Sequence, residues 1–112
     1  MIGNNEVRLI GNVVKEPETF STTNGNMGKL RIACNTKRFD GTEDSLFIDV
    51  KMFGKTYDDL VYYEINRGDK VIACGKLVIE EWTDKEDNKR REPVIYATNV
   101  MKFHKKAKTE SF

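Results

Sequence analysis

Residues 45–54 carry aromatic and charged side chains at alternate positions, a pattern suited to binding chemistry. One parity of this expected strand is an apolar core face of Leu46, Ile48, Val50 and Met52, and the other consists of Phe47, Asp49, Lys51 and Phe53. Large rings on a charged sheet face are unusual unless something covers them. Nucleic-acid bases stack on such rings, and nearby cations bind the phosphates. The strand alone leaves a structural alternative open, in which Phe53 packs under a helix and Phe47 lies in a subunit interface.

Basic residues are interleaved with aromatic ones in two further segments. Lys29 and Arg31 share one face of the expected strand at residues 27–37, and Lys37-Arg38-Phe39 follows at its end. Trp82 opens a charged segment that also carries Lys85, Lys89, Arg90 and Arg91. This composition is typical of a groove for a single nucleic-acid strand. For any one cation the alternative is a solvated surface position, and for Trp82 it is a partly buried anchor of a hairpin.

Catalytic chemistry finds little support in the sequence. His104 is the only histidine, and no nucleophile elbow, phosphate-cradling glycine loop or metal-binding cluster of residues is present. Asp58 and Asp59 fall at an expected helix start, where acidic groups suit the helix dipole. Cys34 and Cys74 lie in apolar alternation without a C-x-x-C pair, which predicts buried thiols in a reducing compartment. We therefore expect no enzyme activity, no cofactor and no metal.

The composition sets the size of the protein and leaves its surface charge open. The 112 residues correspond to about one domain, which we place at residues 1–103, followed by a short flexible tail at residues 104–112. There are 19 Lys and Arg residues against 18 Asp and Glu, a net charge of +1, so any basic surface must come from segregation of the two signs. No signal pattern and no apolar run of membrane-spanning length is present, so we expect a cytoplasmic protein.

Apolar alternation predicts five strands, at residues 6–15, 27–37, 45–54, 69–81 and 93–103. Glu16-Pro17-Glu18 ends the first strand, and Asn24-Gly25 is a turn signal before the second. Residues 38–44 are expected to form a polar loop, and residues 82–92 a charged loop or hairpin tip. Gly11 and Gly75 interrupt two strands, which indicates the bulges or sharp bends that a small barrel needs.

The apolar period becomes helical after the third strand. Tyr57, Leu60, Val61 and Ile65 recur at helical spacing, with Thr56 as the expected N-cap and Gly68 in the stop signal. Three strands, one short helix and two strands are the layout of the OB-fold, an all-β, five-stranded Greek-key barrel with a helix between strands three and four. An SH3-like barrel is the structural competitor, but the well-formed helix argues against it.

Short motifs follow one another along most of the chain. They are Asn5-Glu6-Val7-Arg8-Leu9-Ile10-Gly11-Asn12-Val13 with Pro17-Glu18, then Phe53-Gly54-Lys55, then Arg67-Gly68-Asp69-Lys70-Val71 with Gly75-Lys76-Leu77, and finally Trp82-Thr83-Asp84. Each motif is weak alone, but their order and spacing together are specific. Over about residues 5–103 the chain resembles the bacterial and phage single-stranded-DNA-binding protein family.

The resemblance implies sequence-independent binding and protection of single-stranded DNA during replication, recombination or repair. It also implies a homo-oligomer, with a tetramer the first expectation and a dimer the second, assembled partly through first-strand pairing. The resemblance assigns base stacking to Phe47, Phe53 and Trp82, with Phe39 as a fourth ring. Phe47 occupies a position where tryptophan is common in the family. The cations assigned to phosphate are Lys29, Arg31, Lys37, Arg38, Lys51, Lys55, Lys76, Arg90 and Arg91.

The C-terminal end departs from the family. A long flexible tail with an acidic tip that ends in phenylalanine recruits other replication and repair proteins in the family. Here residues 102–108 are basic, and only Glu110-Ser111-Phe112 echoes the tip, which does not favour such recruitment. Two other functions stay open: a protein–protein adaptor of a primosome-like complex, and an RNA-binding OB module, because base stacking is indifferent to the sugar.

Overall fold

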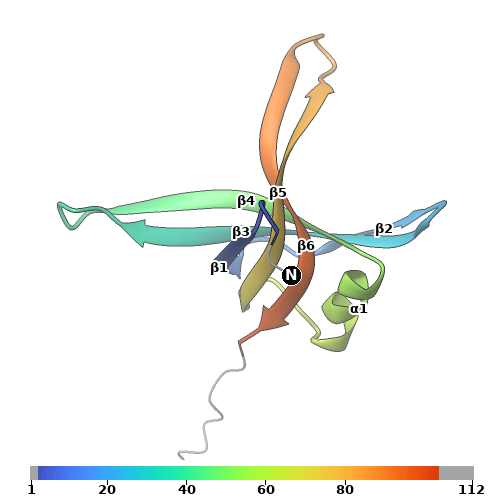
Figure 1. The fold of residues 1–112 in the computed structure, drawn as a ribbon, viewed down its shortest axis with the longest axis horizontal. Helices are drawn as coiled ribbons and strands as arrows, with labels where there is room; N and C mark the ends of the chain where they lie inside the picture. The colour runs from blue at the N-terminus through green and yellow to red at the C-terminus, as the bar shows by residue number, and fades with distance from the viewer. Residues whose placement is uncertain (1–2, 104–112) are drawn as a thin grey trace, which may run out of the picture.

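The computed structural model describes residues 3–103, which form six strands and one helix (Figure 1). In chain order these are β1 (Val7–Val13), β2 (Glu18–Thr22), β3 (Gly25–Lys37), β4 (Glu43–Phe53), α1 (Lys55–Tyr62), β5 (Lys70–Thr83) and β6 (Lys89–Lys102). The helix lies against one end of the crossing strands, and three hairpins extend outward.

The sheet closes into a ring of 5 strands, in the order β1-β5-β6-β4-β3, because β3 also pairs with the end of β1. Neighbouring strands run antiparallel except β4 and β6, which are parallel. The strand β2 lies outside the ring and pairs with β3. Since α1 follows the third strand of the ring, the predicted all-β barrel with one short helix is confirmed.

Two glycines allow the strands to approach closely enough to close this ring. Gly11 is paired with β5 just before β1 also begins to pair with β3 at Asn12, and a Cβ at Gly11 would lie 2.6 Å from the Ala33 carbonyl oxygen. The register between β5 and β6 shifts between Cys74 and Gly75, and a Cβ at Gly75 would overlap the Tyr96 carbonyl oxygen. The irregularity predicted at Gly75 is confirmed, whereas the register of β1 with β5 continues through Gly11 without a bulge. A larger side chain at either position would force the backbones apart.

The core lies inside the ring and under α1. Its largest fully buried side chains include Leu30, Ile32, Val50, Met52 and Ile95, contributed by β3, β4 and β6. Leu60 of α1 is also buried and joins the same cluster. Alternation in β3 and β4 places their remaining side chains on the outer surface, where the candidate site lies.

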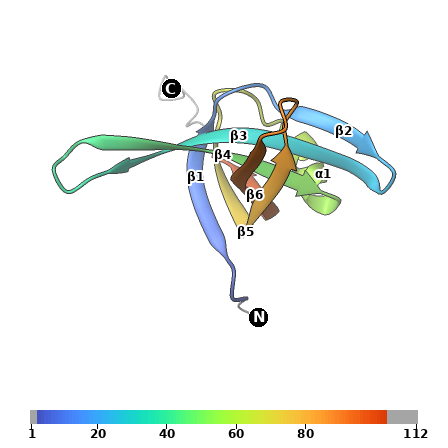
Figure 2. The ribbon, with the colours of Figure 1, turned by 90° about the horizontal axis from the view of Figure 1, so that it is seen from above.

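Three hairpins extend beyond the barrel, and we call them arms. The β2–β3 arm turns after Thr22, the β3–β4 arm turns at residues 38–42, and the β5–β6 arm turns at residues 84–88. Figures 1 and 2 show that their tips point in different directions. The Asp84 carboxylate accepts hydrogen bonds from the backbone N–H groups of Asn88 and Glu86, each 2.9 Å long, which lower the pKa of Asp84 and order the tip of the β5–β6 arm.

Three expectations for the first half of the chain are wrong. The first strand ends at Val13, and residues 18–22 form β2, because the turn at Asn24-Gly25 folds this segment back onto β3. Since β4 begins at Glu43, the loop expected at residues 38–44 is shorter. Leu46, expected in the core, is 44% exposed, because it lies at the rim of the barrel where the β3–β4 arm begins.

The helix and the following hairpin also differ from expectation. Gly54, with φ of 56°, occupies the N-cap position instead of Thr56, because the tight exit from β4 places the helix start at Lys55 and buries Thr56. The helix ends at Tyr62, so buried Ile65 follows it, and Val61 is exposed. Most of the loop expected at residues 82–92 is strand, since β5 continues to Thr83 and β6 begins at Lys89.

The remaining expectations concern single residues and the tail. Cys34 is a buried free thiol, and burial raises its pKa, whereas Cys74 is only half-buried. Within residues 3–103, no helix is long and apolar enough to cross a membrane, and no group of three or more His, Cys, Asp or Glu side chains is arranged to hold a metal ion. The expected tail, with His104 and Glu110-Ser111-Phe112, lies outside the described residues.

Candidate nucleic-acid interface

On the outer surface of β3 and β4, site residues predicted on the strand at residues 45–54 lie beside those predicted on the strand at residues 27–37. The register pairs Lys29 with Lys51, Arg31 with Asp49 and Ala33 with Phe47, so these side chains share one face. Phe47 and Phe53 are 50% and 45% exposed, which confirms that they point away from the core. We call this surface the central face and define it by Lys29, Arg31, Phe47, Asp49, Lys51 and Phe53.

The cations of the central face are paired with carboxylates. Arg31 Nη1 lies 3.0 Å from Asp49 Oδ1 and 3.8 Å from a Glu92 carboxylate oxygen, and Lys29 Nζ lies 3.8 Å from Asp49 Oδ2. Lys51 Nζ lies 2.9 Å from both carboxylate oxygens of Glu80. A phosphate that binds here must therefore compete with carboxylates already in place.

Glu80 also holds an aromatic ring that sequence reasoning missed. The Tyr96 hydroxyl donates a 2.6 Å hydrogen bond to Glu80 Oε2, and this bond lowers the pKa of Glu80, with Lys51 as a further cause, and raises that of Tyr96. The Tyr96 ring packs against Phe53, with centroids 5.4 Å apart and planes at 60°. The only sequence signal was an aromatic residue in the fifth predicted strand, since the partners lie 16 and 43 positions away by their numbers (96 − 80 and 96 − 53).

The β3–β4 arm carries a second group of predicted residues. Phe39 is fully exposed at the tip. Arg38 donates to both carboxylate oxygens of Asp44, and this contact raises the pKa of Arg38. Lys37 is exposed and forms no ion pair within residues 3–103. These residues lie away from the central face, along an arm that extends outward from the barrel (Figure 1).

The β5–β6 arm carries the third group. Trp82 is 45% exposed and lies opposite Arg90 in the register, so part of its ring is accessible from outside. Arg90 pairs with Asp84 and Arg91 with Glu81, each at 3.0 Å. A shallow hollow of about 270 Å³ lies between Trp82 and these arginines.

Two predicted lysines lie near the ends of the central face. Lys55 is the exposed first residue of α1, two positions after Phe53. Lys76 lies on β5 opposite Tyr96. Neither forms an ion pair with any residue that the structure describes.

Residues 4–103 match the family model described as the Single-strand binding protein family. The chain belongs to this family. The single-stranded DNA-binding protein of Wolinella succinogenes is 31% identical over 111 residues, which cover 95% of this chain and 68% of that protein. The protein of the same name from Deinococcus radiodurans is 36% identical over 101 residues, and this chain spans only 33% of its length.

Two solved structures have the same fold as this chain. The small single-stranded DNA-binding protein of Streptomyces coelicolor aligns with a TM-score of 0.75 at 19% identity, covering 90% of this chain and 96% of that one. A Plasmodium falciparum SSB in complex with ssDNA aligns with a TM-score of 0.79 at 17% identity, covering 93% and 98%. The predicted OB-fold and the predicted family are confirmed.

Proposed function

We propose that this protein binds single-stranded DNA without sequence preference and protects it during replication, recombination or repair. The observation that carries the proposal is the central face, where two half-exposed phenylalanine rings lie among three cations on the outside of the closed barrel. Unpaired bases stack on such rings whatever their sequence, because every base has a π face. Membership of the Single-strand binding protein family and the names of the relatives support the same function.

Each group of residues takes one role in this proposal. Phe47, Phe53 and Trp82 stack bases, with Phe39 as a fourth platform on the β3–β4 arm. Lys37, Lys55 and Lys76, which have no ion-pair partner among residues 3–103, contact phosphates directly. The paired cations contact phosphates by sharing or exchanging their carboxylates, and they are Lys29, Arg31, Arg38, Lys51, Arg90 and Arg91. The protein acts by binding, without catalysing a reaction, and it works in the cytoplasm.

A homo-oligomer belongs to the same proposal, with a tetramer first and a dimer second. Over Val7–Ile10, β1 pairs only with β5, which leaves its other edge for a second copy. Apolar side chains also remain on the outer surface near this edge and along β5, among them Ile10, Leu77 and Ile79, which are 38–46% exposed. Pairing between copies covers both features.

A salt-dependent titration tests the proposed function. Oligo-dT, duplex DNA of equal length and oligo-rU are each titrated with fluorescence polarisation as the readout. We expect oligo-dT to bind much more tightly than duplex, with a log–log salt slope of about −0.7 per phosphate neutralised. Equal affinity for duplex and single strand would overturn the proposal, equal or tighter binding of oligo-rU would make the protein an RNA-binding module, and no binding would leave the adaptor function.

A further inference from the structure

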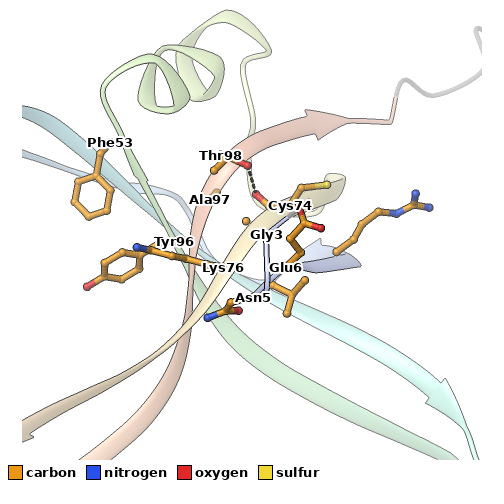
Figure 3. A pocket seen from close by; sticks show the side chains of 12 residues that line it. Gly3, Asn5, Glu6, Phe53, Cys74, Lys76, Tyr96, Ala97 and Thr98 are labelled. Atoms are coloured by element: carbon orange, nitrogen blue, oxygen red, sulfur yellow. Dashed lines mark hydrogen bonds between the residues drawn. The ribbon is translucent and has the colours of Figure 1, made fainter. Parts of the chain in front are cut away.

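A cleft of about 730 Å³ begins where the central face ends. Phe53 and Tyr96 line one end, Lys76 and Ala97 lie along its length, and Asn5 lies on the opposite side (Figure 3). Because Phe53 belongs to both surfaces, a strand that stacks on Phe53 lies directly beside the cleft. The volume falls in the range of about 300–1,000 Å³ that is usual for sites of small ligands.

The far wall of the cleft is held by hydrogen bonds that replace a strand pairing. Asn5 Nδ2 donates to the Leu77 carbonyl oxygen at 2.9 Å, and the Leu77 N–H donates to Asn5 Oδ1 at 3.0 Å. These two bonds fasten the segment before β1 to β5. The register shift beside Gly75 leaves Thr98 unpaired on β6, and its hydroxyl donates to the Cys74 carbonyl oxygen at 3.4 Å. The cleft is therefore formed by contacts within one chain.

The ring of Tyr96 is fixed at the near end of the cleft. The Phe53 ring packs against it, and its hydroxyl is bonded to Glu80, which in turn is held by Lys51. A ring that is already ordered loses little freedom when a base stacks on it, which favours binding. Tyr96 is thus prepared as a stacking platform in the same way as the rings of the central face.

The charges of the cleft differ from those of the central face. Arg8 and Lys76 both line it, and neither has an ion-pair partner among residues 3–103. Glu6 is the one carboxylate among the lining residues. On the central face, by contrast, Lys29, Arg31 and Lys51 already have carboxylate partners. A phosphate that enters the cleft can therefore bind Arg8 and Lys76 without displacing a carboxylate of residues 3–103.

We propose that this cleft binds the nucleotides that continue beyond the base stacked on Phe53. Tyr96 is a further stacking platform there, and Arg8 and Lys76 contact the phosphates. The inference rests on the proposed function, because it extends the path of the same single strand. It assigns to Tyr96, Arg8 and Lys76 a shared subsite at the end of the central face.

Two sets of variants test the subsite with a long oligo-dT as the probe. Tyr96→Ala removes the ring, and we expect affinity to fall by about fivefold or more, the lower end of the effect of losing one stacked base. Tyr96→Phe keeps the ring and should lose much less. The double variant Arg8→Ala/Lys76→Ala should flatten the log–log salt slope by about 1.4, twice the 0.7 of one phosphate contact. Arg67→Ala, an exposed arginine near the end of α1, is the matched control and should change neither quantity.

Amide NMR on the intact protein gives a readout that is independent of the substitutions. The backbone N–H signals of Gly75, Ala97 and Thr98 should shift when oligo-dT is added. Thermal unfolding of each variant establishes that it is folded at the titration temperature, and should Tyr96→Ala fail to fold, the arginine–lysine variant and the amide shifts still decide.

The outcomes separate this inference from the proposed function. If oligo-dT binds and Phe47→Ala weakens it, while the cleft variants bind normally and the cleft amides do not move, the function stands and the subsite is overturned. If the cleft amides move with protein concentration instead of DNA, the occupant is a second copy of the chain and the subsite is again overturned. If oligo-dT does not bind at all, both proposals fail.

Discussion

The guanidinium group of Arg31 on β3 lies over the ring of Phe47 on β4, with 6.0 Å between Cζ and the ring centroid. The same group donates a 3.0 Å hydrogen bond to Asp49. A π surface, a cation and a carboxylate are therefore within reach of one nucleotide. Because each would act on DNA through a different force, substitutions at these positions distinguish stacking from charge.

Removal of a stacking ring should weaken binding without changing its dependence on salt. Phe47→Ala and Phe53→Ala should each lose about 1–3 kcal/mol of binding free energy. The salt slope should stay the same, because no phosphate contact is lost. Both rings are half-exposed, so the loss in unfolding free energy should be well below the roughly 3–5 kcal/mol of a core phenylalanine.

A matched control for these rings is Phe20→Ala. Phe20 is 44% exposed on β2, close to the 45% of Phe53, but it lies outside the candidate site. Its removal should leave the affinity for oligo-dT unchanged. Severe unfolding of Phe47→Ala, with normal affinity in the folded fraction, would show that Phe47 has a structural role instead.

Neutralising Asp49 should tighten binding. Asp49→Asn removes a negative charge from the central face and leaves Lys29 and Arg31 with only their more distant carboxylate partners, Glu18 at 3.9 Å and Glu92 at 3.8 Å. We expect higher affinity at low salt and a steeper salt slope, measured by titration of oligo-dT at several salt concentrations. For the same reason, Lys37→Ala should flatten the slope more than Arg31→Ala does, since Lys37 has no carboxylate partner within residues 3–103. A weaker-binding Asp49→Asn protein that is fully folded would contradict this account of the central face.

DNA should quench the emission of Trp82, the only tryptophan. The indole is 45% exposed beside Arg90 on the β5–β6 arm, so a base has access to its face. A base stacked on an indole quenches its fluorescence. A steady-state titration with oligo-dT measures the effect directly, and duplex DNA is the control. Unchanged emission at saturation would remove Trp82 from the interface.

The Glu80–Tyr96 contact should stabilise the fold over a defined range of pH. The lowered pKa of Glu80 means that its contribution is complete above its ordinary value of 4.5 and is lost as the pH falls through the folded value. The raised pKa of Tyr96 means that its contribution is present below 10.0 and is lost as the pH rises through the folded value.

Chemical denaturation of the wild type and of Glu80→Gln, as a function of pH, checks this range. The difference in unfolding free energy should be constant near neutral pH and shrink below about 4.5. When Glu80→Gln is made in a Tyr96→Phe protein, the loss of unfolding free energy at neutral pH should be smaller, because the hydroxyl that donates a hydrogen bond to Glu80 is already absent. A difference that does not depend on pH would mean that the charge of Glu80 contributes nothing.

Light scattering should return a mass close to four times the 12.9 kDa of one chain, with twice that mass as the second expectation. The free edge of β1 and the exposed apolar residues on β5 account for the association. A charged substitution at the outer surface, Ile79→Lys, should shift the mass downward if this surface is buried between copies. A monomer mass for the wild type would exclude the proposed assembly.

Sequence alone located the barrel and its outward rings because the signals for both are local. Alternation with a period of two assigned Phe47 and Phe53 to the outer face and Val50 to the core. Gly75 within an apolar alternation indicated the irregularity between β5 and β6. The N-cap was assigned to the wrong residue, since Gly54 in a positive-φ turn and Thr56 two positions later are both reasonable helix starts until the exit from β4 is known.

Pairing between distant strands decided which cations of the site have carboxylate partners. No local sequence pattern shows these partners. The sequence shows 19 cations and 18 carboxylates but not which of them meet. Arg31 meets Asp49 through the register of the β3–β4 hairpin. Lys51 meets Glu80, Arg31 meets Glu92, and Tyr96 joins Phe53 only because closure of the ring sets the register of β4 against β6 and of β5 against β6. A shift of one residue would turn each of these side chains to the other face. The chain's own alternation therefore determined which rings face outward, and the closed sheet determined which cations remain free to bind a phosphate.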